Sequence, residues 1–184
     1  MKNTCPDEDI RLVDKYKNGD KRSLETLYNK YKVKLLRIIW YYVYDRQDAE
    51  DILQTLFLKL IKKIHKYKHY KDVKFRTWMY MVASNTAKDF LRKKRPTVNI
   101  ETVENYIENK YEKVFKKVES MEMIKEVQKK VLLLPIKYRE VISLIFFENF
   151  KYDEVASILN KPLGTIKSRA NYAMNLLRKQ FKVD

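Results

Sequence analysis

The 184-residue chain contains one cysteine, two glycines and four prolines, and each scarcity excludes a class of structure. A single cysteine, Cys5, can form neither an internal disulfide nor a cysteine-built zinc site, so the chain suits a reducing compartment. Few glycines and prolines leave long segments without helix breakers, and strand signals are weak. We therefore expect a nearly all-helical chain.

Long hydrophobic runs are also absent. The most apolar stretch, LLRIIWYYVY at residues 35–44, is too short to span a bilayer and contains Arg37. The N-terminus, MKNTCPDEDI, lacks the apolar core of a signal peptide. These features predict a soluble, cytoplasmic protein without direct membrane insertion.

Acidic residues are few relative to basic ones: 24 Asp and Glu stand against 40 Lys and Arg, which gives a formal net charge of +16. This balance favours polyanionic partners, because binding releases the counterions of the polyanion. The polyanion could be nucleic acid or an acidic membrane surface, and a merely solvated basic face is the alternative. Net charge alone does not distinguish nucleic acid, a membrane surface and a solvated face, so the positions of the charged residues must be considered.

No constellation of catalytic residues is evident in the sequence. The chain has no phosphate-binding loop and no Ser/His/Asp set. His65 and His69 have a four-residue spacing that suits zinc on a helix, but no third ligand is near them in the sequence. We expect a protein that is not an enzyme and that has no cofactor or metal.

Helix start and stop signals divide the first half of the chain into four helices. Gly19 ends a short first helix, and Asp20 or Ser23 can cap the second. Asp48 is predicted to cap the third, and Pro96 ends the fourth. Residues 1–96 are therefore predicted to form one helical domain. Its apolar stripes are Ile10, Val13 and Tyr16; Leu24, Leu27, Tyr28, Tyr31, Leu35 and Ile38; Ile52, Leu56, Leu60 and Ile64; and Phe75, Trp78, Met79, Val82, Ala83, Thr86 and Phe90.

Residues 97–118 mix glutamates with lysines and have weak apolar periodicity, which is typical of a linker. Residues 119–184 again contain apolar residues at helical spacing, so a second small domain is expected there. The predicted fold class is all-α, with two small helical domains joined by a linker.

The segment KYDEVASILNKPLGTIKSRANYAMNLLRK has the spacing of a helix-turn-helix. Asn160 can adopt the left-handed conformation that ends the first helix, and Pro162 prevents that helix from continuing. Leu163 is expected to pack into the core, Gly164 to allow the turn and Thr165 to cap the second helix. An ordinary helical hairpin with a charged solvent face is the alternative. A recognition helix would present to the major groove Lys167, Ser168, Arg169 and Asn171.

Three segments resemble the second and fourth conserved regions of bacterial sigma factors. They are DAEDILQTLFLKL (48–60), FRTWMYMVASNTAKDFLRKKR (75–95) and LPIKYREVISLIFFENFKYDEVASILNKPLGTIKSRANYAMNLLRK (134–179). Since no long segment separates these regions, the chain is similar to the extracytoplasmic-function (ECF) group. The resemblance implies a promoter-specificity subunit of RNA polymerase, in which one domain recognises and melts the −10 element and the other recognises the −35 duplex.

The resemblance also implies the partners. These are core RNA polymerase, through the clamp helices of its largest subunit and the flap of the second largest, together with promoter DNA and an anti-sigma factor. The residues implied in docking on the clamp helices are Asp48, Asp51, Leu53, Gln54 and Phe57. Helix capping and core packing are the alternative roles of these residues.

The aromatic basic loop KYKHYKDVK at 66–74 and the helix after it are implied in capture of the −10 element. Unstacked bases are held by aromatic and polar side chains, whereas lysines and arginines hold phosphates without reading sequence. Trp78 lies on the apolar stripe, so we expect a core position for it. The base-pocket candidates are Tyr67, His69, Tyr70 and Lys71, with Asn85 as a polar base contact. The phosphate-binding candidates are Lys88, Arg92, Lys93, Lys94 and Arg95.

The −35 element would be read by the last helix. Its candidates are Thr165, Lys167, Ser168, Arg169, Asn171 and Tyr172. Many members of the family have His-Arg-Ala-Arg where this chain has Asn-Tyr-Ala-Met at 171–174, glycine in place of Asn160, and arginine in place of Met81 and Ser84. The loss of arginines removes groups suited to guanine or phosphate, so no −35 sequence is predicted.

Two other functions compete with this interpretation. A stand-alone helix-turn-helix regulator needs only the C-terminal half and leaves the 48–60 segment and the aromatic basic loop unexplained. A protein that binds RNA or a membrane surface would use net charge alone. A sigma factor accounts for all of these segments together.

Overall fold

The structure, a computed structural model, describes residues 8–67, 73–94 and 121–182, and every regular element in these ranges is helical. The first group of helices is α1 (Glu8–Lys17), α2 (Lys21–Val43), α3 (Arg46–Ile64) and α4 (Phe75–Lys93). The second group is α6 (Met121–Leu132), α7 (Ile136–Ile142) with the π-helical turn η1 (Ser143–Phe147), α8 (Tyr152–Leu159) and α9 (Leu163–Lys182). The all-α prediction is confirmed.

Local signals set the end of α1 and the start of α2. Gly19 has a φ of 101°, in the region that favours glycine, and ends the turn after α1 as predicted. Asp20 caps α2 by accepting a hydrogen bond from the Arg22 backbone N–H at 3.0 Å.

The predicted cap of α3 is wrong by three residues. The cap is Asp45, whose extended backbone precedes the helix and whose carboxylate accepts from the Asp48 N–H at 2.8 Å. Asp48 therefore lies within the first turn, where its charge still favours the positive end of the helix dipole.

The helix-turn-helix is present, but its second helix begins earlier than predicted. Asn160 ends α8 with a φ of 50°, as expected for a left-handed cap. Helix α9 starts at Leu163, so Gly164 lies in the first turn without a positive φ and Thr165 is not the cap. Leu163 is 41% exposed and does not pack into the core. The fixed φ of Pro162 suits a residue just before a helix, and its carbonyl accepts from the Ile166 N–H at 3.2 Å.

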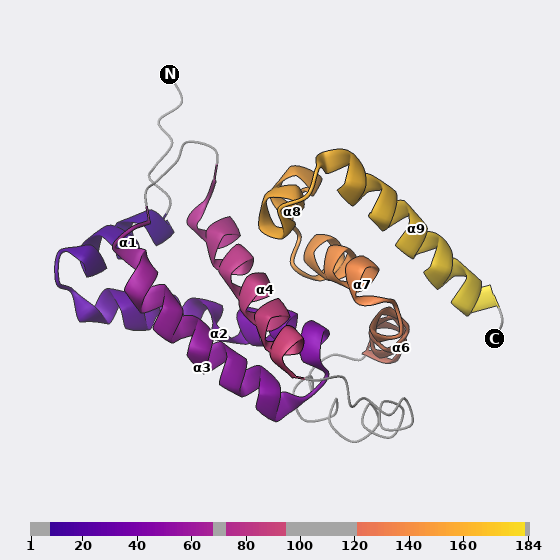
Figure 1. The fold of residues 1–184 in the computed structure, drawn as a ribbon, viewed down its shortest axis with the longest axis horizontal. Helices are drawn as coiled ribbons and strands as arrows, with labels where there is room; N and C mark the ends of the chain where they lie inside the picture. The colour runs from indigo at the N-terminus through magenta and orange to yellow at the C-terminus, as the bar shows by residue number, and fades with distance from the viewer. Residues whose placement is uncertain (1–7, 68–72, 95–120, 183–184) are drawn as a thin grey trace.

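In the first group, α2 lies at the centre and packs on α1, α3 and α4. In the second group, α9 packs on α7 and α8 (Figure 1). The predicted inward face of α9 is correct at its fully buried positions, Ile166, Ala170, Ala173 and Leu177, whereas Leu176 is half-buried.

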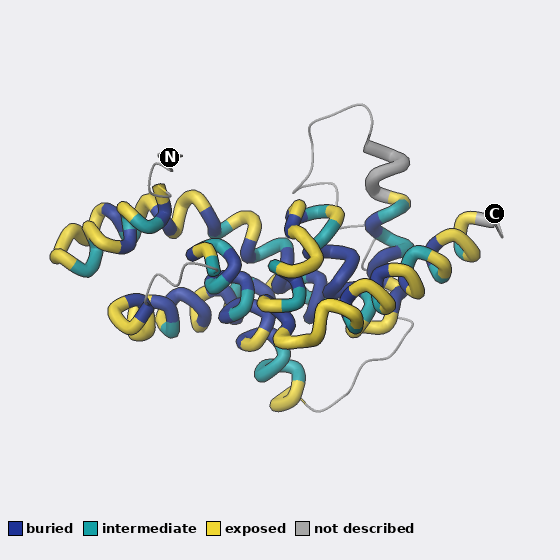
Figure 2. Tube along the Cα trace, turned by 90° about the horizontal axis from the view of Figure 1, so that it is seen from above, coloured by how far each residue is buried: buried dark blue, intermediate teal, exposed yellow. Residues whose placement is uncertain are grey.

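The two groups also pack against each other, which the sequence did not predict. Helix α4 lies beside α8, and α2 lies beside α7 (Figure 1). Tyr41 stacks on Phe147 with ring centroids 5.4 Å apart, and Tyr80 meets the edge of Phe150 at 4.7 Å. Buried residues consequently continue through the centre of the molecule where the groups meet (Figure 2). The predicted linker, 97–118, lies outside the described residues, and the domain boundaries stay predictions.

No helix in the described ranges combines the length and the apolar character that a membrane span requires.

Candidate nucleic-acid and polymerase-binding surfaces

The predicted docking residues on α3 divide into exposed and buried sets. Asp51 and Gln54 are exposed. Leu53 and Phe57 are each only 8% exposed, and the Phe57 ring packs edge-on against Tyr28 at 4.6 Å. Asp48 is half-buried and forms an ion pair with Lys94 at the end of α4. Of this set, only Asp51 and Gln54 are therefore exposed to a partner.

Two exposed apolar residues extend this surface, and sequence analysis missed them. Leu58 is 63% exposed and Ile61 is 37% exposed. Together with Asp51 and Gln54 they recur at steps of three, four and three residues, so they share one face of the helix. The signal was available in the sequence, because these positions fall off the buried stripe of α3. We call these four residues the α3 stripe.

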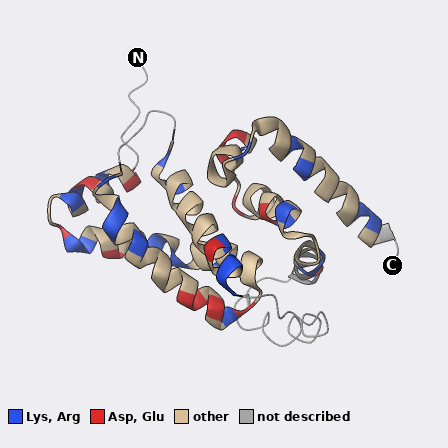
Figure 3. Ribbon diagram, in the orientation of Figure 1, with Lys and Arg blue, Asp and Glu red and all other residues tan. Residues whose placement is uncertain are grey.

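Charge is unevenly distributed along α3. Acidic residues gather near its N-terminal end and basic residues near its C-terminal end (Figure 3). Both arrangements agree with the helix dipole. A partner that contacts the whole helix would therefore need basic groups at one end and acidic groups at the other.

Several basic residues predicted to bind −10 phosphates lie on α4, and most of them are already paired. Lys88 forms an ion pair with Glu140 at 2.8 Å, Arg92 pairs with Asp89, and Lys94 pairs with Asp48. Lys93 and Asn85 are exposed. Arg95 lies outside the described residues.

The loop candidates are only partly described. Tyr67 is buried, with its ring against Phe75 at 5.2 Å and Trp78 at 5.1 Å. Trp78 is half-buried and packs against the core, in agreement with the expected core position. Tyr67, Val73 and Trp78 line a cavity of about 290 Å³ that Ser157 of α8 also borders. His69, Tyr70 and Lys71 lie outside the described residues.

The candidate −35 residues occupy the first half of α9. Lys167, Ser168, Asn171 and Tyr172 are exposed, whereas Thr165 and Arg169 are half-buried. Lys167 has no ion-pair partner within the described ranges. Arg169 donates to Glu140 at 3.2 Å. The Tyr172 ring lies 4.8 Å from the ring of Tyr138 on α7, so this tyrosine is oriented by packing although half of it is exposed.

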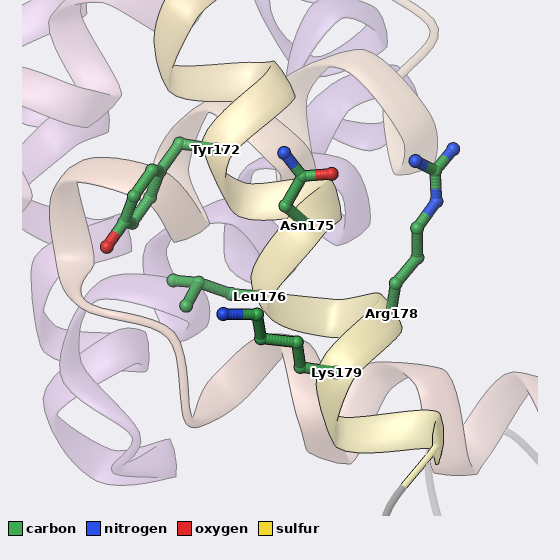
Figure 4. A pocket seen from close by; sticks show the side chains of 5 residues that line it. All are labelled: Tyr172, Asn175, Leu176, Arg178 and Lys179. Carbon is green, nitrogen blue, oxygen red and sulfur yellow. The ribbon is translucent and has the colours of Figure 1, made fainter.

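The exposed face of α9 continues beyond the candidates. Tyr172, Asn175, Leu176, Arg178 and Lys179 line an open groove, with Tyr172 and Leu176 on one side and Arg178 on the other (Figure 4). The residues after Tyr172 were not among the sequence candidates. The sequence did contain a signal for them. They follow Tyr172 at steps of three and four residues, which is the spacing of neighbours on one face of a helix.

Gly164 lies at the head of this exposed face. A Cβ atom built there would meet nothing within 4 Å. Since its backbone is helical and the space is open, neither φ nor packing requires glycine at this position.

Two buried glutamates, Glu140 and Glu148, were also missed by sequence analysis. They are 5% and 4% exposed and lie between the two groups of helices. Burial and then the nearby Glu140 carboxylate raise the pKa of Tyr42 well above its usual value. Burial and then Glu148 do the same to the pKa of Tyr80. Both phenols therefore remain protonated and donate hydrogen bonds to these carboxylates.

The described residues hold no cluster suited to a metal. No group of three His, Cys, Asp or Glu side chains converges within these ranges. The ring of His65 instead lies 5.5 Å from the ring of Tyr16.

Comparison with known families gives two matches in the same order as the predicted regions. The family described as "Sigma-70 region 2" matches residues 27–97, and "Sigma-70, region 4" matches residues 124–177. Together the two matches cover more than half of the chain.

Two characterised relatives match over most of their length. RNA polymerase sigma-H factor of Pseudomonas aeruginosa is 33% identical over 172 residues, which is 89% of this chain and 88% of the relative. ECF RNA polymerase sigma factor SigW of Bacillus subtilis is 31% identical over 183 residues, which is 94% of this chain and 96% of the relative.

Two solved structures have a similar fold. CnrH, solved in complex with the cytosolic domain of CnrY, has a TM-score of 0.71 at 18% identity, covering 97% of this chain and 99% of that chain. The sigma factor RpoE of Bartonella quintana, solved with the anti-sigma factor NepR, has a TM-score of 0.65 at 22% identity, covering 87% of this chain and 97% of that chain.

Proposed function

Because this chain belongs to the ECF group of the sigma-70 family of RNA polymerase sigma factors, we propose that it binds core RNA polymerase and directs initiation at specific promoters. In this role the first group of helices melts the −10 element and the second group reads the −35 duplex. The observation that carries the proposal is the presence of both sigma regions, in order, on a chain whose α3 stripe and α9 face are both exposed. A stand-alone regulator would need only the second region.

The polymerase contact is assigned to the α3 stripe. Two polar residues beside two exposed apolar residues form a small surface with hydrogen-bonding groups and a hydrophobic centre, which is typical of a protein interface. Buried Leu53 and Phe57 support the backbone of this face from below, and Asp48 is held by Lys94. The clamp helices of the largest subunit are the proposed partner of this stripe, and the flap of the second largest subunit is the proposed partner of the second group.

The promoter contacts are assigned to α4 and α9. Asn85 is exposed and suited to a base edge, while Lys88, Arg92, Lys93 and Lys94 supply positive charge for phosphates. On α9, Lys167, Ser168 and Asn171 project from the turns nearest the helix start, which is the part of a recognition helix that reaches the major groove. Tyr67 is buried against Phe75 and Trp78 of α4, so we propose that it shapes the −10 base pocket from behind.

An anti-sigma factor and a cytoplasmic location follow as further parts of the proposal. The RpoE structure was solved with an anti-sigma factor, but an identity of 22% establishes the fold and not the partner. The polymerase that a sigma factor serves is cytoplasmic, so we propose the same location for this chain. We also propose that the chain has no catalytic activity of its own.

Run-off transcription tests the function directly. Purified protein added to core RNA polymerase should produce discrete transcripts from a set of genomic fragments, and polymerase without it should not. Tight sequence-specific binding by the protein alone, without any new transcripts in the presence of polymerase, would support the stand-alone regulator instead.

Gly164→Ala should show an effect on DNA contact that is not caused by a loss of stability. The added methyl group meets open space, and alanine stabilises a helix relative to glycine by about 0.5 to 1 kcal/mol, so thermal stability should not fall. If the missing side chain lets the DNA backbone approach α9, the same variant should reduce −35-dependent transcription by about tenfold, which corresponds to about 1.4 kcal/mol. Melting temperature and run-off yield are the measurements. A stable variant with full transcription would show that DNA does not come close to this residue.

A further inference from the structure

Tyr172 is the only aromatic residue among the six −35 candidates on α9. It is 52% exposed, and it lies four residues after Ser168 and three after Arg169, so the three side chains share one face of the helix. Its polar neighbours already have partners within the protein: the Ser168 hydroxyl donates to the Thr165 carbonyl at 3.0 Å, and Arg169 donates to Glu140 at 3.2 Å. Tyr172 therefore supplies the large apolar surface on this part of α9.

The Tyr172 ring is held by a neighbour on α7. The centroid of the Tyr138 ring lies 4.8 Å from that of Tyr172, and the ring planes are inclined by 31°, which falls within the distance range of favourable aromatic pairs. Lys137 places a cation 4.9 Å from the centroid of the Tyr138 ring. Tyr138 is itself half-buried where α7 packs on α9. Holding Tyr172 against a partner then costs little conformational entropy, because a tyrosine has only two side-chain torsions and packing already restricts them.

Tyr172 and Leu176 form a small apolar patch with basic side chains near it (Figure 4). Both border the open groove that Arg178 and Lys179 also line. Lysines and arginines suit DNA phosphates, which carry no sequence information. The major groove between the phosphates presents one apolar group, the C5-methyl group of thymine. An aromatic ring with cations beside it is therefore suited to a thymine in duplex DNA.

Resting on the function proposed above, we propose that Tyr172 is a specificity-determining residue that reads a thymine of the −35 duplex through its C5-methyl group. The methyl group packs on the exposed part of the Tyr172 ring. Tyr138 is the positioning residue, because it keeps that ring in one orientation. The other three bases present no methyl group in the major groove, so the contact favours thymine at one position. The contact uses the ring and does not require the phenol hydroxyl.

Replacement of single thymines with deoxyuridine tests the contact, because deoxyuridine pairs as thymidine does and lacks only the methyl group. Each thymine of the −35 duplex, on either strand of a promoter found by run-off transcription, is replaced in turn. The modified and unmodified templates then compete for core polymerase carrying the full-length chain, and the ratio of their transcripts is measured. At one position the unmodified template should be favoured by about three- to fivefold, the effect of burying one methyl group.

Variants of Tyr172 assign this ratio to the ring. Tyr172→Ala should bring the ratio to about 1, whereas Tyr172→Phe retains the ring and should keep the wild-type ratio. The control is Phe146→Ala, which removes a ring of similar exposure, 50%, from η1 and should also keep the ratio.

Three results would overturn the inference. The first is an unchanged ratio in Tyr172→Ala. The second is loss of the ratio in Tyr172→Phe, which would assign the contact to the hydroxyl. The third is weaker binding of Tyr172→Ala to core polymerase, which would make Tyr172 a polymerase contact.

Variants of Tyr138 test its positioning role. Tyr138→Ala should lower the ratio although Tyr138 does not touch the base, and Tyr138→Phe should restore it because the aromatic pair is kept. Thermal unfolding shows whether each variant is folded. A folded Tyr138→Ala protein with the wild-type ratio would show that Tyr138 does not position the ring.

Transcription and binding by the free chain separate this inference from the proposed function. If the wild type gives specific transcripts but no ratio depends on Tyr172, thymine reading is wrong and the sigma function stands. The free chain is also used to select duplexes from random-sequence DNA. If polymerase gains no promoter specificity, but the selected duplex loses affinity on thymine replacement only when Tyr172 is present, thymine reading stands and the proposed function fails.

Discussion

Transcription from a promoter that requires its −35 element should fall by about tenfold or more when Lys167 is replaced with alanine. A specific contact between a side chain and a base pair contributes about 1 to 3 kcal/mol, and each 1.4 kcal/mol corresponds to a factor of about ten. Lys167 is exposed and has no ion-pair partner in the described part of the chain, so its removal should not disturb the fold. Run-off yield, with core-polymerase binding measured on the same protein, tests this.

Arg169→Ala should behave differently, because Arg169 also pairs with Glu140. Its removal deletes the proposed DNA contact and also the ion pair with buried Glu140. The loss of transcription should be as large as for Lys167→Ala, and thermal stability should fall as well, because a buried carboxylate loses one of its donors. Lys21→Ala, which removes an exposed lysine at the start of α2, is the control. Loss of core binding by either α9 variant would mean that α9 has been assigned the wrong partner.

Local signals were sufficient for much of the fold. Gly19 and Asn160 end helices where a positive φ is needed, and an apolar residue every three or four positions located the buried face of α9. The cap of α3 was predicted wrongly at a place where two aspartates lie three residues apart and only the second was considered. Asp45 and Asp48 are both good caps three residues apart, and only the backbone conformation distinguishes them.

The contacts between the groups could not be predicted in this way. Glu140 meets Tyr42 across 98 positions of sequence, and Glu148 meets Arg37 across 111. Helical periodicity reports which face of a helix is buried but not which distant helix covers it. A glutamate within an apolar run such as VISLIFFENF is a usable signal nonetheless, because a buried carboxylate requires donors from elsewhere in the chain.

The second large effect is expected on α3, where exposed residues can be replaced without disturbing buried ones. Asp51→Ala combined with Gln54→Ala should weaken binding to core polymerase by at least about 30-fold, since a hot-spot residue contributes about 2 kcal/mol. Both side chains are exposed, so stability should be unchanged within about 0.5 kcal/mol. Affinity for core polymerase, measured by fluorescence anisotropy, and thermal unfolding are the paired readouts.

Leu58→Ala tests whether the apolar half of the α3 stripe takes part. Leu58 is 63% exposed, so truncation should reduce polymerase affinity with little effect on unfolding. The same truncation at Leu53 or Phe57 would confound the two readouts, because removing a buried side chain costs about 2 to 5 kcal/mol of stability. Asp14→Ala removes another exposed carboxylate, on α1, and should change neither readout. If the Asp51 and Gln54 double variant binds polymerase as tightly as this control, the polymerase does not use the α3 stripe, and the exposed leucine and isoleucine need another partner.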